Sequence, residues 1–243
     1  MGSYEKQSQA SPVSVVRRAF LLLVRTWRHN VVSLPRIAAT MENALATEIA
    51  NAAARLVVEE GLEWGPAKRR AIKVLGLPAR TPLPDNDSVE DAVREYLALF
   101  CADTQPRELQ ALRELALVWM ERMQAFRPYL GGAVWHGTAT RLSDIYISLF
   151  CDDSKSAEIA LIDRHVSYEP GSIKGLRGEQ VNVLSVSSHS RELNEEIGVH
   201  LLIYDLDDLR GALRVDGRGR VPRGDIEAVQ RLLQQATSSL PNP

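Results

Sequence analysis

Residues 134–150 read VWHGTATRLSDIYISLF, and this stretch decides the fold. A short apolar run is followed by Gly137, a polar connection and a second run that is rich in isoleucine and aromatic residues. Runs of this composition that are separated by a glycine are typical of two strands joined by a turn. We therefore predict strands at 133–136 and 145–150, joined through Gly137.

The spacing of Asp144 and Tyr146 determines which way their side chains face. Residues i and i+2 of a strand lie on the same face of the sheet, so these two side chains should share one side. A pair of carboxylates at such positions can bind the metal ions that bridge the phosphates of a nucleotide. A glycine turn beside them can bring backbone amides close to the same phosphates.

This pattern resembles that of the nucleotidyltransferase superfamily, which includes DNA polymerase beta, and also of uncharacterised bacterial nucleotidyltransferase-like proteins. The family has glycine and a small hydroxyl residue after one strand, then Ser-Asp-hydrophobic-Asp at the start of the next. The resemblance covers about 126–213 and implies a nucleotidyltransferase-like fold with a bound Mg²⁺ or Mn²⁺ ion. It implies that the nucleotide is bound by Gly137, Thr138, Ser143 and Tyr146, with Asp144 as the first metal ligand.

Tyr146 departs from the pattern, because the family has its second carboxylate there. A phenol with a pKa near 10 is a poor ligand for Mg²⁺. A third carboxylate often comes from a later strand in the family, and 199–205 is the candidate, with His200 and Asp205 as its polar residues. We predict Asp144 and His200 as catalytic residues and Asp144 with Asp205 as metal ligands; Asp144, His200 and Asp205 together could instead hold a transition metal.

Two functions remain open at this point, and whether the chain is an enzyme is undecided. The favoured one is binding of a nucleotide or nucleic acid, with metal-dependent nucleotidyl transfer by an incomplete carboxylate set. The alternative is a catalytically inactive interaction module, and Tyr146 is its main support. The plainer structural roles also stand: Gly137-Thr138 as an ordinary turn, and Tyr146 and His200 as core residues.

The chain on either side of the motif predicts an α+β fold, with a mixed sheet, flanking helices and a helical N-terminal region. Apolar stripes at helical spacing precede the motif, whereas short β-type runs follow it. The run 199–203 is almost wholly apolar, so it should be a central strand. Besides the two strands above we expect strands at 165–169, 181–187 and 199–204, and helices at 88–100, 106–126, 154–164, 207–213 and 225–236.

The first third of the chain predicts three further parts. We expect a basic, disordered extension at 1–40, a helical hairpin at 41–77 and, after a proline-rich linker, the nucleotidyltransferase-like domain at 88–243. The formal net charge of the whole chain is −2, but its first 80 residues carry 12 basic and 6 acidic side chains. An anionic partner should therefore contact this part. The basic helix 66–73 is a candidate for phosphate contacts.

Composition excludes some classes of protein. No apolar run reaches the roughly 18 residues that a membrane span needs. The two cysteines, Cys101 and Cys151, lack zinc-site spacing and are too few for a disulfide framework, so we expect a cytoplasmic protein. Substrate and oligomeric state do not follow from the sequence.

Overall fold

The computed structural model describes residues 34–239 of the 243, and the side chains of 42–236. The chain divides into two compact units, residues 1–48 and 49–243. Helix α2 (Leu34–Glu60) begins in the first unit and ends in the second. Residues 1–33 of the predicted extension 1–40 lie outside the described residues. The predicted domain boundaries stay predictions.

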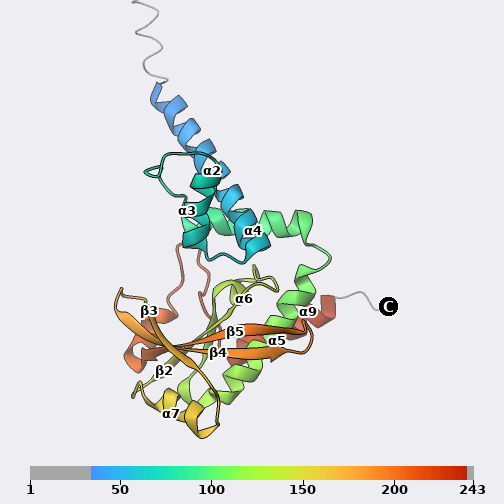
Figure 1. The fold of residues 1–243 in the computed structure, drawn as a ribbon, viewed down its shortest axis with the longest axis vertical. Coiled ribbons are helices and arrows are strands. Elements are labelled where there is room, and N and C mark those ends of the chain that lie inside the picture. The colour runs from blue at the N-terminus through green and yellow to red at the C-terminus, as the bar shows by residue number, and fades with distance from the viewer. Residues whose placement is uncertain (1–33, 240–243) are drawn as a thin grey trace, which may run out of the picture. The chain divides into compact units, whose positions relative to one another are not determined.

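Three helices form the N-terminal part of the second unit (Figure 1). α2 ends before Gly61, which has a φ of +67° and caps the helix as its position in the sequence predicts. α3 (Trp64–Val74) follows at once, and a loop with three prolines leads to α4 (Asn86–Phe100). The cap of α4 is Asp85, whose carboxylate accepts the backbone N–H of Ser88 at 2.6 Å. We had expected Ser88 itself to begin this helix.

The rest of the unit is an α+β fold built on a five-stranded mixed sheet, which confirms the predicted fold class. The strand order is β1-β2-β5-β4-β3, in which β2 and β5 are parallel and all other neighbours are antiparallel. The elements are α5 (Gln105–Arg122), η1 (Gln124–Phe126), β1 (Tyr129–Gly131), α6 (Gly132–His136), β2 (Ile145–Cys151), α7 (Ser156–Asp163), β3 (Glu169–Lys174), β4 (Gln180–Ser190), β5 (Glu195–Asp205), η2 (Leu206–Asp208), α8 (Leu209–Ala212) and α9 (Ile226–Ser239).

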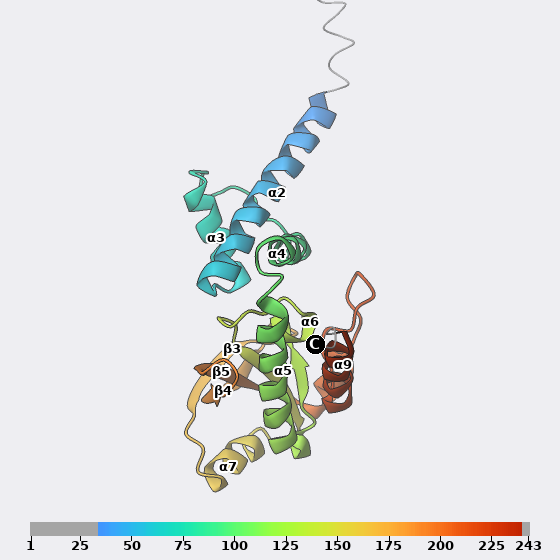
Figure 2. The ribbon, with the colours of Figure 1, turned by 90° about the vertical axis from the view of Figure 1, so that its right-hand side faces the viewer.

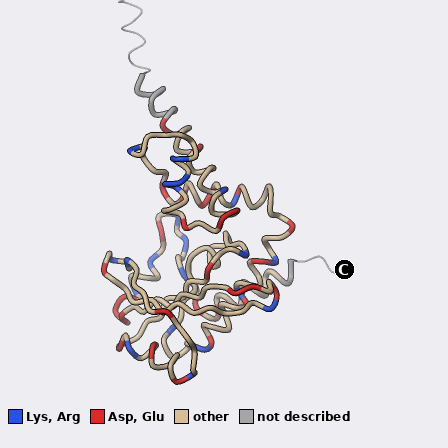
Figure 3. The backbone as a smooth tube through the Cα atoms, viewed as in Figure 1, with Lys and Arg blue, Asp and Glu red and all other residues tan. Residues whose placement is uncertain are grey.

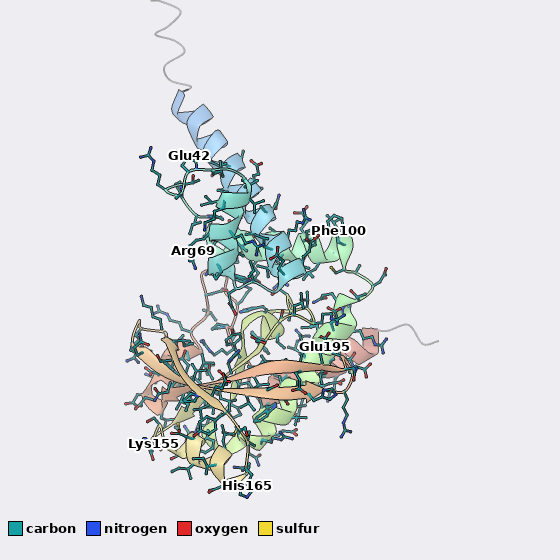
Figure 4. The ribbon with its side chains drawn as sticks, viewed as in Figure 1. Glu42, Arg69, Phe100, Lys155, His165 and Glu195 are labelled. Carbon is teal, nitrogen blue, oxygen red and sulfur yellow. The ribbon has the colours of Figure 1, made fainter. Side chains whose placement is uncertain are left out.

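The two faces of the sheet have different surroundings. Helices α5, α7 and α9 contribute to the main core on one face, where α5 and α9 lie side by side (Figure 2). α7 lies between Lys155 and His165 (Figure 4). On the other face a smaller core covers only the half of the sheet beside η2 and α8. The remaining half of that face is free to form a site.

The prediction of a strand at 133–136 is wrong. The first strand, β1, ends at Gly131, and Gly132, with a φ of +66°, turns the chain into the short helix α6. The guanidinium of Arg113 on α5 stabilises that helix by donating to two of its carbonyl oxygens, at 3.1 and 3.3 Å. The predicted strand at 165–169 is likewise displaced, because β3 begins only at Glu169.

The central position of β5, which the sequence predicts, makes its core residues expensive to remove. Leu201 is fully buried in the main core, so Leu201→Ala should lower the free energy of unfolding by about 2–5 kcal/mol. The matched control is Leu99→Ala at a leucine that is 68% exposed, and it should cost less than about 0.5 kcal/mol. Urea unfolding measures both; equal losses would contradict the position of β5.

Candidate functional site

The site is built on the parallel pairing of β2 and β5. Tyr146 and His200 are neighbours in its register, and their rings lie 4.8 Å apart between centroids. Asp144, which directly precedes β2, has its Oδ2 atom 3.2 Å from Nε2 of His200. The structure therefore brings three of the predicted site residues together on one face of the sheet.

His200 is held from both sides. Its Nδ1 atom lies 2.9 Å from the hydroxyl of Ser185 on β4, the neighbouring strand. Because a carboxylate oxygen can only accept, the Nε2–H of His200 donates to Asp144, and in the neutral imidazole Nδ1 then accepts from Ser185. The imidazole thus links the two side chains, and this network fixes its orientation.

Gly198 makes room for the carboxylate of Asp144. A Cβ atom at residue 198 would lie only 2.5 Å from Oδ1 of Asp144. Any larger residue there would displace the carboxylate. This role could not be predicted from the sequence, because a lone glycine within a strand has no distinctive pattern.

Tyr146 is engaged with a residue that lies 83 positions away in the chain. Its hydroxyl donates to Oε1 of Glu63, at 2.7 Å, just before α3. Burial raises the pKa of Tyr146 well above its ordinary value, and the neighbouring carboxylates of Glu63 and Asp144 raise it further. The phenol therefore stays protonated. Glu63 was not predicted, since only the tertiary fold brings it to the motif.

A cavity of about 790 Å³ opens beside these residues. Gly61 sets the spacing of two of its walls, because a Cβ atom there would come within 3.0 Å of Leu142. A volume of this size is within the range of small-molecule sites. The lining comes from Val57, Gly61–Gly65, Asn86, Asp87, Glu90, Gly132, Ala133, His136, Leu142–Asp144, Tyr146, Asp216 and Arg220.

The predicted nucleotide-binding residues divide into two groups. Ser143 and Tyr146 line the cavity, and the hydroxyl of Ser143 accepts the backbone N–H of Thr140 at 3.0 Å. Gly137 and Thr138 are not part of the lining: Gly137 ends α6 and faces Arg113 on α5, and Thr138 is buried. The glycine that follows a strand and lines the cavity is Gly132. The expected glycine turn after a strand is therefore at Gly132 and not at Gly137, because residues 132–136 form a helix.

Asp205 is not brought to Asp144. It is paired with Cys151 at the far end of the parallel strands, and its carboxylate accepts the backbone N–H of Asp207 at 2.9 Å. Within the described residues, no group of three or more His, Cys, Asp or Glu side chains could hold a metal ion. Asp144, a protonated phenol and an imidazole do not supply the several oxygen anions that Mg²⁺ prefers, and the nearby Glu63 carboxylate already accepts from the Tyr146 hydroxyl.

A loop from the C-terminal part completes the cavity wall through ion pairs. Arg220 donates to the buried Glu90 at 2.6 Å and to Asp216 at 2.9 Å, and Arg94 also donates to Glu90 at 2.7 Å. Burial by itself would raise the pKa of Glu90, but the hydrogen bonds from the two arginines outweigh it and hold that pKa below its usual value. This arginine-rich loop is therefore fastened to α4.

The predicted basic helix 66–73 lies within α3, and two of its four cationic side chains contact other described residues. Lys68 donates to Asn86 at 2.8 Å and to the carbonyl of Pro84 at 3.0 Å, and Arg70 pairs with Glu60. Arg69 and Lys73 are exposed. No helix in the described part of the chain is long and apolar enough to cross a membrane.

Comparisons with known proteins give weak matches. No protein-family model matches the chain, and no curated protein matches it. Solved structures of the Cid1 poly(U) polymerase match at low similarity. The form with bound MgGTP has a TM-score of 0.29 at 13% identity, covering 47% of this chain and 38% of that one. The complex with the UTP analogue UMPNPP also has a TM-score of 0.29, at 10% identity, covering 62% and 41%.

A third Cid1 structure has a TM-score of 0.31 at 12% identity, and covers 50% of this chain and 38% of that one. This chain thus spans about two fifths of the length of the structures it matches. TM-scores of this size carry no argument about activity, metal or partner. What the site can do has to follow from its own geometry.

The contacts of Glu90 give a test of how the cavity wall is held. The side chain is only 3% exposed, so Glu90→Gln, which removes the charge that both arginines contact, should cost about 2 kcal/mol at neutral pH. Because the folded-state pKa is lowered, this stabilisation is present above the ordinary pKa of a glutamate and is lost as the pH falls through the lowered value. The variant and the wild type should therefore converge in acid.

Urea unfolding at several pH values measures this difference. The matched control is Glu59→Gln, whose carboxylate also pairs with an arginine and a tyrosine but is exposed, and its effect should be small. A loss for Glu90→Gln that is no larger than the control's, or that persists in acid, would contradict the assigned clamp.

Proposed function

We propose that this chain is a nucleotidyltransferase-like protein that does not catalyse metal-dependent nucleotidyl transfer and acts as a ligand-binding module. A single observation carries the proposal: Tyr146 and His200 lie side by side, with their rings tilted by 30°, on the sheet face where the resemblance calls for carboxylates. Hydrogen bonds to neighbouring side chains hold both rings in these positions.

The chemistry supports the loss of transfer. Two metal carboxylates supply several kcal/mol of transition-state stabilisation by holding the ions that neutralise phosphate charge. Tyr146 stays protonated, and its hydroxyl donates to Glu63, so it does not replace the missing anion. Asp144 keeps its carboxylate beside Tyr146, with His200 as its hydrogen-bond partner.

Binding of a nucleotide or nucleic acid with Mg²⁺ or Mn²⁺ is the second candidate. It is favoured by the position of Asp144 and Gly132 on one cavity of suitable size, with Arg69 and Lys73 on α3 as exposed cations. On either function, the unpaired cysteines Cys101 and Cys151 fit a reducing, cytoplasmic setting.

Calorimetry with ATP and Mg²⁺ separates the two candidates. Wild type should show no metal-dependent binding, and Asp144→Asn should behave like wild type. Asp144 is 49% exposed, so that variant should also keep its free energy of unfolding within about 1 kcal/mol. Tyr146→Asp should bind Mg²⁺ at least about tenfold more tightly than wild type, because it adds a second carboxylate on the same face.

Binding of ATP and Mg²⁺ by wild type that disappears in Asp144→Asn would overturn the proposal in favour of nucleotide handling. A Tyr146→Asp protein that folds normally, as judged by thermal unfolding, but gains no affinity for Mg²⁺ would contradict the assignment of these positions. Tyr146→Phe is the control for loss of the hydroxyl alone.

A further inference from the structure

The cavity beside Asp144 retains its volume and its walls whether or not transfer occurs. The turn 61–65, the start of α4 and the connection that leads into β2 meet there, together with α6 and the loop that carries Asp216 and Arg220. Leu62, Trp64 and Leu142 give the lining an apolar part. An aliphatic chain can therefore pack against it.

The polar part of the lining is strongly acidic. It holds the carboxylates of Glu63, Asp87, Glu90, Asp144 and Asp216 and the guanidinium of Arg220, while Arg94 and Arg218 pair with Glu90 and Asp87 from outside the lining. The whole chain has a formal net charge of only −2, and Figure 3 shows acidic and basic residues interspersed along the backbone. With the arginine partners of Asp87, Glu90 and Asp216 counted, the excess of negative charge in the cavity comes from Glu63 and Asp144.

Two of these carboxylates face the cavity without a cation of their own. Arg220 is committed to Glu90 and Asp216, and Asp87 is paired with Arg218. Among the described side chains, no lysine or arginine pairs with Glu63 or Asp144, whose partners are Tyr146 and His200. Burial also lowers the pKa of His136 in the lining, so its imidazole adds no charge at neutral pH.

We propose that this cavity binds an aliphatic polyamine, with one ammonium group between Glu63 and Asp144 and the methylene chain against Trp64 and Leu62. The inference rests on the proposed function, because it needs the carboxylates to be free of a metal-bound nucleotide. An anionic ligand without a metal would instead meet uncompensated negative charge.

The donors and acceptors match in number. A primary ammonium has three N–H donors and no acceptor. Glu63 and Asp144 each offer carboxylate oxygens, and the Tyr146 oxygen, whose hydrogen is given to Glu63, keeps lone pairs for a third bond. Aromatic rings such as that of Trp64 also attract cations, which favours an amine over an uncharged alcohol of the same length.

Calorimetry with spermidine tests the inference on the full chain at low ionic strength. Wild type should bind spermidine, and the affinity should fall as salt is added, because the attraction is between charges. Glu63→Gln and Asp144→Asn should each bind about tenfold more weakly, which is the size expected for loss of one charge-assisted hydrogen bond. The matched control is Asp163→Asn, which makes the same charge change on the exposed end of α7, outside the cavity lining.

Two ligand controls complete the design. 1,8-Octanediol has a chain of similar length without charge, and ATP without metal has the opposite charge, and neither should bind. Absence of spermidine binding to wild type would overturn the inference, and so would equal binding by the Glu63→Gln, Asp144→Asn and Asp163→Asn proteins. If Asp144→Asn does not fold, Glu63→Gln still decides, because Glu63 is exposed.

The failure of this inference differs from failure of the proposed function. A protein that binds neither spermidine nor ATP with Mg²⁺ retains the proposed function and loses the polyamine site. A protein that binds ATP with Mg²⁺ through Asp144 loses the proposed function and the polyamine site with it.

Discussion

The parallel pairing of β2 with β5 is the constraint on which the site depends. Ile145, Ile147 and Leu149 alternate with Tyr146 along β2, and on β5 Val199, Leu201 and Ile203 alternate with His200 in the same way; the six apolar residues belong to the main core. A slip of either strand by one residue would bury its polar side chains and expose its core residues. Burial on one face of the sheet therefore fixes the contacts among Asp144, Tyr146 and His200 on the other.

A second set of contacts turns that sheet face into a cavity. Glu63 accepts from Tyr146, and Arg220 donates to Glu90, so the helical segment and the C-terminal loop are each tied to the site by a polar contact. Gly61 permits the close approach of the segment around Leu142. These contacts join parts of the chain that lie 80 to 130 residues apart. The helices therefore belong to the site as well as to the fold.

Periodicity predicted what depends on local pattern: the α+β class, the central position of β5, and the shared face of Asp144 and Tyr146. It failed at 133–136, where a run that is apolar enough for a strand becomes α6. That outcome depends on Gly132 and on the contacts from Arg113 to α6. The partners Glu63, Gly198 and Ser185 could not be predicted, because their roles arise only from distances between elements.

The change from carboxylate to phenol at residue 146 also reverses the charge that the site can accept. Carboxylates bind a phosphate only through metal cations that bridge the two, because both groups are negatively charged. The protonated phenol at 146 does not supply such a carboxylate, and in the proposed site Glu63 and Asp144 contact a cationic ligand directly. One substitution in the motif therefore favours a cation where the resemblance implies a nucleotide.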